Sequence, residues 1–113
     1  MAKTKLIMEL GTGSDLHGGD NTKAARRAVD DAIRHGSLLY LGEIMKQGIR
    51  PKMHVDVTIG APKPETVDSN AVLEALPFGE KTIKVVAGGL DIATGETDHI
   101  TICNAAVMVS VES

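Results

Sequence analysis

The apolar and polar residues of this chain follow two different periods. Apolar residues at every second position predict a β-strand at residues 4–10 and another at 52–61, because alternate side chains of a strand point to opposite faces. Further apolar runs predict strands at 81–87 and 98–111. Residues 91–98, DIATGETD, read as a hairpin connection before the last strand.

Helical periodicity marks two other segments. Residues 22–35 carry one apolar stripe with charged residues around the rest of the surface, which predicts an amphipathic helix. The stripe consists of Ala25, Ala28, Val29, Ala32 and Ile33. A shorter helix is expected at residues 69–76, where Pro77 ends it, and one or two helical turns are expected within 37–48.

The resulting order is β-α-β-α-β-β. A parallel β-α-β crossover is right-handed in nearly all proteins, which places the first helix on one face of the sheet, and the second helix is expected to join it there. The predicted fold is therefore α+β, a two-layer sandwich with a mixed four-stranded sheet.

The sheet face without helices is predicted to mix apolar and polar side chains. It is too apolar for a fully solvated face, so we expect a homo-oligomer with this face in the contact between subunits. The residues assigned to this face are Lys5, Ile7, Glu9, His54, Asp56, Thr58, Ile102, Asn104, Ala106 and Met108.

Composition narrows the class of protein. The 113 residues suit a single domain spanning 1–113, and 42% hydrophobic residues are enough for a packed core. The net charge of −3 and only two aromatic residues argue against a nucleic-acid partner. No apolar run reaches the length of a membrane span, and the N-terminus lacks the features of a signal peptide. One cysteine excludes an internal disulfide, so a cytoplasmic protein is expected.

The glycine-rich segment 11–20, GTGSDLHGGD, is the strongest functional signal. It leaves a predicted strand and enters a helix, where free backbone N–H groups and the helix dipole favour a negative ligand. The segment matches neither common phosphate-loop pattern, so a small anionic molecule is expected rather than a nucleotide. The residues predicted to bind it are Gly11, Gly13, Gly18, Gly19 and Lys23, with Gly88 and Gly89 as a second close approach of the backbone.

Asp15 and His17 are the candidate catalytic residues. In an extended segment their i, i+2 spacing points both side chains the same way, so the carboxylate could orient the imidazole as a general base. The pair could equally supply two ligands to a divalent metal, although no complete set of metal ligands is visible in the sequence. The third alternative is structural, with Asp15 turning the chain beside a surface histidine. No cofactor is predicted.

The same segment resembles a family of short conserved hypothetical proteins named after a Listeria locus. That family is recognised by a Gly-x-Gly-x-Asp-x-His-Gly motif, and Gly11, Gly13, Asp15, His17 and Gly18 occupy its positions here. The resemblance continues through IGAPKPE, LPFGE and the triplet at 88–90, and it implies no particular reaction. The element order is also similar to the chorismate-mutase-like fold of trimeric bacterial proteins, which implies sheets packed inward and a trimer or a multiple of it.

Two functions are therefore expected, in this order. The first is a small-molecule-binding protein or an enzyme of the hydrolase, lyase or isomerase class, with an anionic-ligand site at residues 11–20 near a subunit interface. The second is a non-catalytic, ligand-binding or regulatory oligomer. A purely structural oligomer is a third alternative, in which the glycines only shape a turn.

Overall fold

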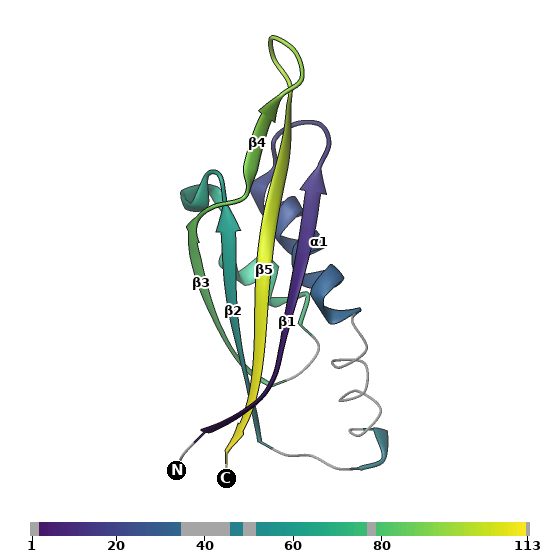
Figure 1. Ribbon diagram of the computed structural model, residues 1–113, viewed down its shortest axis with the longest axis vertical. Coiled ribbons are helices and arrows are strands. Elements are labelled where there is room, and N and C mark those ends of the chain that lie inside the picture. The colour runs from purple at the N-terminus through teal and green to yellow at the C-terminus, as the bar shows by residue number, and fades with distance from the viewer. Residues whose placement is uncertain (1–2, 35–45, 49–51, 77–78, 113) are drawn as a thin grey trace.

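The computed structural model describes residues 3–34, 46–48, 52–76 and 79–112, and side chains within 7–34, 46–48, 52–76 and 79–110. Two α-helices, one 3-10 turn and five strands are assigned over these residues (Figure 1). In chain order they are β1 (Lys3–Asp15), α1 (Asn21–Ile33), β2 (Met53–Ala61), η1 (Pro64–Thr66), α3 (Ser69–Leu73), β3 (Glu80–Ala87), β4 (Leu90–Ala93) and β5 (His99–Glu112). Most of the predicted turns at 37–48 lie outside the described residues.

The sheet is mixed and has five strands, with the order β1-β5-β2-β3. β5 runs antiparallel to β1 on one side and to β2 on the other, whereas β2 and β3 are parallel. β4 extends the β2 side by pairing with the first part of β5, from Leu90 opposite Ile102 to Ala93 opposite His99. The predicted four-stranded sheet is therefore wrong by one strand, which forms within the segment assigned to a hairpin connection.

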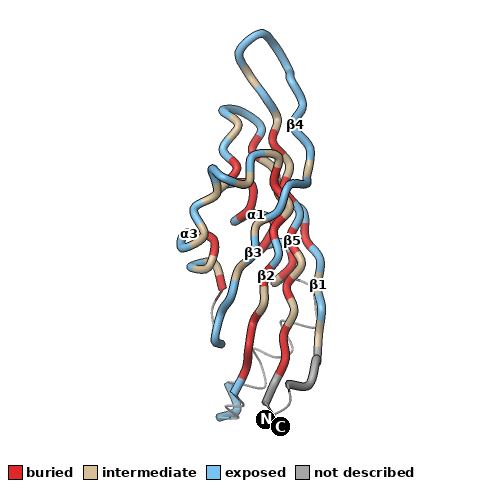
Figure 2. Tube along the Cα trace, turned by 90° about the vertical axis from the view of Figure 1, so that its left-hand side faces the viewer, coloured by how far each residue is buried: buried red, intermediate tan, exposed pale blue. Residues whose placement is uncertain are grey.

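Both helices lie on the same side of this sheet (Figures 1 and 2). α1 packs on β1 and β5, and Val72 of α3 is fully buried in the same core. The core fills the space between the layers with small and branched side chains: Ala24, Ala25, Ala28, Val29, Ala32, Met53, Val55, Val57, Ile59, Ala61, Val72, Leu76, Cys103, Ala105, Val107 and Val109. The predicted α+β class is confirmed. No helix in the described ranges is long and apolar enough to span a membrane.

β1 continues five residues beyond the predicted end at residue 10, because its two glycines lie beneath α1. A Cβ atom on Gly11 would lie 2.2 Å from the carbonyl oxygen of Ala28. Both Gly11 and Gly13 have negative φ and pair with Ala105 and Cys103 of β5. These glycines therefore allow helix and strand to approach closely, and assigning them to a loop was wrong.

This arrangement also fixes which residues of β1 face away from the helices. Ile7 packs against the core and Gly11 is buried, whereas Met8, Leu10 and Thr12 are exposed on the opposite face. The expectation that Ile7 and Glu9 lie on the open face is therefore wrong. The predicted faces of β2 and β5 are correct: Val57 and Val107 are buried, while the alternate residues are less so.

The two helices begin at side-chain caps. Asp20 precedes α1 and its carboxylate accepts a hydrogen bond from the Lys23 N–H at 3.0 Å. Asp68 caps α3 in the same way through the Ala71 N–H. α3 is shorter than predicted and continues as tighter turns to Leu76. The caps place the start of α1 immediately after the end of β1, where the candidate site lies.

Candidate functional site

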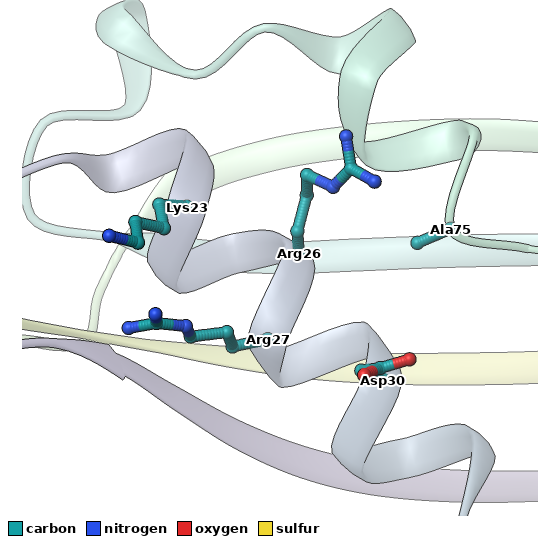
Figure 3. Close-up of a pocket in the computed structure, with 5 residues that line it drawn as sticks. All are labelled: Lys23, Arg26, Arg27, Asp30 and Ala75. Carbon is teal, nitrogen blue, oxygen red and sulfur yellow. The ribbon is translucent and has the colours of Figure 1, made fainter.

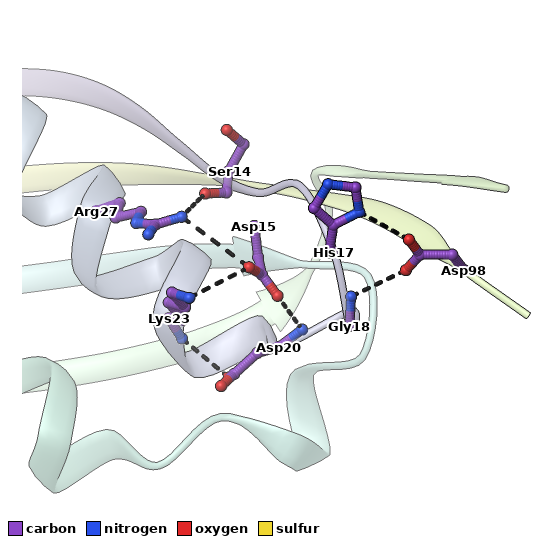
Figure 4. A network of polar contacts seen from close by, with 8 residues as sticks. All are labelled: Ser14, Asp15, His17, Gly18, Asp20, Lys23, Arg27 and Asp98. Carbon is purple, nitrogen blue, oxygen red and sulfur yellow. Dashed lines mark hydrogen bonds and ion pairs between the residues drawn. The ribbon is translucent and has the colours of Figure 1, made fainter. Parts of the chain in front are cut away.

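Asp15, the last residue of β1, is a buried carboxylate facing the start of α1 (Figure 4). Its side chain is 4% exposed and accepts a hydrogen bond from the Asp20 N–H at 2.9 Å. The Lys23 ammonium lies 3.7 Å away and the Arg27 guanidinium lies 4.0 Å away. Arg27 also donates to the carbonyl of Ser14 at 2.6 Å. Asp15 therefore ties the loop to the helix and holds two cations in place.

His17 faces a different part of the molecule, the turn before β5. Its Nδ1 lies 2.8 Å from Oδ2 of Asp98, while the His17 side chain is 85% exposed (Figure 4). Oδ1 of Asp98 accepts hydrogen bonds from the backbone N–H groups of Gly18 and His99. The bond to His17, followed by these two backbone bonds, lowers the pKa of Asp98 to about 2. Asp98 is therefore a fixed carboxylate that orients the His17 ring.

Asp15 and His17 thus belong to two separate networks within the described residues. Asp15 contacts Asp20, Lys23 and Arg27, whereas His17 contacts Asp98. Figure 4 shows the two side chains reaching toward different partners. The expectation that they face one cavity as a pair relied on an extended backbone, but β1 ends at Asp15 and the chain bends through Gly18 and Gly19, both with positive φ.

The loop N–H groups predicted to hold an anion donate to carboxylates of the chain itself. Gly18 donates to Asp98, Asp20 donates to Asp15, and Lys23 donates to the Asp20 side chain. Negative groups do lie at the start of α1, where the helix dipole favours them, but they are side chains of the protein itself. Lys23 and Arg27 lie beside one of these carboxylates, that of Asp15.

These cations line a pocket of about 290 Å³ on the outer side of α1 (Figure 3). The pocket is lined from successive turns of the helix by Lys23, Arg26, Arg27 and Asp30, and from the chain after α3 by Ala75. The three cationic side chains are each about half exposed. Lys23 belongs to the predicted site, whereas the sequence analysis assigned Arg26 and Arg27 only to a charged helix surface.

Asn21 is a second residue that sequence reasoning missed. It is buried, and its side chain joins three segments: Nδ2 donates to the Gly19 carbonyl at 3.2 Å, and Oδ1 accepts from the Lys63 N–H at 3.0 Å. Its carbonyl also accepts a weak bond from the Cys103 thiol at 3.6 Å. The only sequence signal was its position at the helix start, where asparagine is typical of a cap.

The remaining candidate residues, Gly88, Gly89 and Cys103, are accounted for by packing within the fold. Gly88 lies against Gly60, and Gly89 has a φ of 66° with the Ile102 carbonyl so close that a Cβ would lie 2.0 Å away. Their packing at the turn from β3 to β4 explains both glycines without a ligand. Cys103 is buried, as expected, and burial raises the pKa of its thiol to about 11.

Two further histidines of the described residues, His54 and His99, pair with carboxylates. His54 lies 3.3 Å from Glu80, and His99 lies 3.1 Å from Asp91. Within the described parts of the chain, no three histidine, cysteine or acidic side chains are grouped in a way that could hold a metal ion. The site is thus a set of cations beside an oriented histidine.

Comparison with known proteins places this chain among uncharacterised relatives. A family model described as "Conserved hypothetical protein (Lin0512_fam)" matches residues 5–109. The crystal structure of an FtsZ-like protein of unknown function from Nostoc punctiforme is similar over 100% of this chain and 99% of that one, with 38% identity and a TM-score of 0.83. Among curated proteins none matches.

Proposed function

The chain belongs to the Lin0512 family of conserved hypothetical proteins, and from this premise we propose that it binds a small anionic molecule, a carboxylate or phosphate, at the cationic pocket of α1. The observation that carries the proposal is the convergence of Lys23, Arg26 and Arg27 on one pocket of about 290 Å³. That volume suits a small metabolite rather than a polymer.

The charges around the pocket favour an added anion. Lys23 and Arg27 share one carboxylate, Asp15, at 3.7 and 4.0 Å. Arg26 lies 3.9 Å from Glu74, which is itself well exposed. These ion pairs are longer than hydrogen bonds, so the cations keep donors free for a ligand.

Asp30 does not cancel this excess of positive charge. It is the one acidic residue among the described residues lining the pocket, and its carboxylate is paired with Arg34 at 3.2 Å. The planar guanidinium groups of Arg26 and Arg27 suit bidentate contacts to a carboxylate or phosphate. Lys23 adds a point charge in the first turn of α1, beside the positive end of the helix dipole.

Calorimetric titration at low ionic strength tests the proposal, with inorganic phosphate and malonate as probes. The expected result is saturable binding that Lys23→Ala and Arg26→Ala each weaken at least fivefold. Lys84→Ala is the matched control, because Lys84 is an exposed cation of β3 outside the pocket. Equal weakening by Lys84→Ala would show unspecific attraction, and an absence of binding by both probes would overturn the proposal.

A second candidate function is acid–base chemistry at His17, of the hydrolase, lyase or isomerase type. The specific observation is the 2.8 Å contact between His17 Nδ1 and Asp98, which leaves Nε2 facing solvent. A carboxylate on Nδ1 fixes the tautomer, so that Nε2 carries the lone pair that a general base needs. Asp98 was not among the predicted residues, and in this proposal it takes the orienting role first assigned to Asp15.

We also propose that the layering of the fold is chorismate-mutase-like, and the strand order supports this. Without the short β4, the strand order is β1-β5-β2-β3, and β5 runs antiparallel to β1 and β2. Such an arrangement leaves one face of the sheet for other subunits and directs α1 outward. The pocket on α1 would then remain open to solvent in an assembly.

A further inference from the structure

The open face of the sheet, opposite the helices, carries nearly all of the large apolar side chains that the described residues leave exposed. These side chains are Met8, Leu10, Leu16, Val86, Leu90 and Ile92, and all except Leu16 lie on this face. Leu10 is the most exposed, at 64%. We propose that the open face is covered by a second copy of this chain.

The half of the face built from β1, β5 and β4 carries no charged side chain among its described residues. Across β1 and β5 the paired rows are Met8 with Met108, Leu10 with Ala106, and Thr12 with Asn104. Toward β4, Ile102 is paired with Leu90 and Ile100 with Ile92. We call this half of the face the uncharged band. Because charged residues make up 24% of the chain, the band is markedly depleted in charged side chains, as expected at the centre of an interface.

Three pairs of polar side chains on the same face are already joined to one another. Asn104 donates to Thr12 at 3.3 Å, Thr82 donates to Asp56, and His54 lies 3.3 Å from Glu80. A polar group can be buried at low cost when its hydrogen bond is made within the protein. A second copy could therefore cover these groups without leaving them unsatisfied.

The size and shape of the face also suit a copy of itself. The molecule measures 52 × 25 × 18 Å, and Figure 1, viewed along the shortest dimension, shows the sheet spread across the two longer ones. The outline set by the two longer dimensions is larger than the roughly 800 Å² per partner of a standard interface. A hollow of about 500 Å³ lies on this face, and its lining includes Gly60, Ala106 and the exposed Leu10, together with one charged side chain, Asp31 of α1. A self-associating surface needs both a projection and a recess, because each copy presents the same patch.

The chemistry of this face favours an identical partner over other macromolecules. Two uncharged bands do not repel each other, whereas a nucleic acid or an acidic peptide would require cations, which lie on the helical side of the molecule at Lys23, Arg26 and Arg27. The proposed contact leaves the pocket on α1 uncovered. The proposal of self-association and the proposal of anion binding can therefore be tested independently of each other.

Sedimentation equilibrium of the full chain between 1 and 100 µM tests this proposal. The wild type is expected to give a multiple of 11.9 kDa, and Leu10→Asp is expected to weaken association at least 100-fold. Leu16→Asp is the matched control, because Leu16 is a similarly exposed leucine, at 55%, off the open face. This control should keep the wild-type mass. Circular dichroism verifies that both variants are folded.

A measurement on the unmodified protein keeps the test decisive if Leu10→Asp does not fold. Met8 is 51% exposed in a single chain, so hydrogen peroxide should oxidise it rapidly in a monomer and at least tenfold more slowly in the proposed assembly. Buried Met53 gives the slow limit within the same sample. A mass of 11.9 kDa at 100 µM, rapid oxidation of Met8, or dissociation by Leu16→Asp but not by Leu10→Asp would overturn the proposal.

Discussion

Gly13 of β1 lies directly against Ala28 of α1. A Cβ atom on Gly13 would lie 2.2 Å from the Ala28 nitrogen and 2.3 Å from the Ala24 carbonyl oxygen. Both obstacles are helix backbone, which cannot rotate away as a flexible side chain could. The contact fixes the distance between the helical layer and β1, and with it the positions of Lys23 and Arg27 beside Asp15.

Gly13→Ala is therefore expected to lower the free energy of unfolding by at least about 3 kcal/mol, the upper end of ordinary overpacking. Gly95→Ala is the control, because nothing lies within 4 Å of the added methyl group. Urea denaturation of both variants measures the difference. Equal midpoints for the two variants would contradict the close packing of α1 on β1.

Asp15→Asn should destabilise the fold without disturbing His17. The asparagine can still accept the Asp20 N–H, but it loses the negative charge facing Lys23 and Arg27. The expected loss in free energy of unfolding is about 1–3 kcal/mol, the range for hydrogen bonds to charged groups.

Combining Asp15→Asn with His17→Gln distinguishes separate networks from a single unit. Because the two side chains share no partner among the described residues, their effects on the free energy of unfolding should add to within about 0.5 kcal/mol. Thermal or urea unfolding of the two single variants and the double variant provides the measurement. Strong non-additivity would restore the interpretation of Asp15 and His17 as one functional pair.

The pKa of Asp98 predicts an acid-sensitive contact between two loops. Its pKa in the folded protein, about 2, is below the ordinary 3.8, so its contribution to stability is fully present above about pH 3.8 and is lost as the pH falls toward 2. Carbon-detected NMR titration of the Asp98 carboxyl should give a midpoint near 2.

The same titration of His17→Gln tests the cause of this low pKa. The hydrogen bond from His17 is the largest contribution, so the Asp98 midpoint should move upward toward 3.8 in the variant. The backbone bonds from Gly18 and His99 should keep it from returning fully. A midpoint that does not change would mean that His17 and Asp98 are not in contact in solution.

Removal of the Asn21 side chain should loosen the junction between α1 and the turn after β2. Asn21→Ala removes the partner of the Lys63 N–H and of the Gly19 carbonyl, and since both groups are partly buried we expect a loss of about 0.5–1.5 kcal/mol for each bond. Asn70→Ala, at an exposed position of α3, should change stability by less than about 0.5 kcal/mol. Thermal unfolding compares the two, and similar melting temperatures would exclude a bridging role.

The sequence predicted those elements whose signals are local. Alternation identified β2, an apolar run identified β5, and the 3.6 period identified α1, because the buried face of each segment imposes these patterns locally. β4 was missed since four exposed residues carry no such pattern and only their pairing with β5 defines them. Gly11 and Gly13 suggested a loop because glycine is typical of loops. The feature that requires glycine here, the close backbone of α1, is distant in the sequence.

For the candidate site, the sequence singled out the segment but not the contacts within it. The negative charge at the start of α1 follows from a general property of helix ends. The pairing of His17 with Asp98, 81 residues away, depends on the pairing of β1 with β5, which the sequence does not define. The spacing of Arg26 and Arg27 predicts ordinary solvated helix residues. It does not show that Ala75, far away in the sequence, lines the same pocket.

The position of β5 has a consequence for how the protein folds. β5 pairs with β1, β2 and β4, yet it follows all of them in the sequence, so only the parallel pairing of β2 with β3 can form before β5 exists. A nascent chain up to residue 98 thus lacks the strand that would join β1 to the rest. Because the sheet depends on contacts between distant residues, folding should be slow relative to helical proteins of this size, and it should be completed only after synthesis of the last strand.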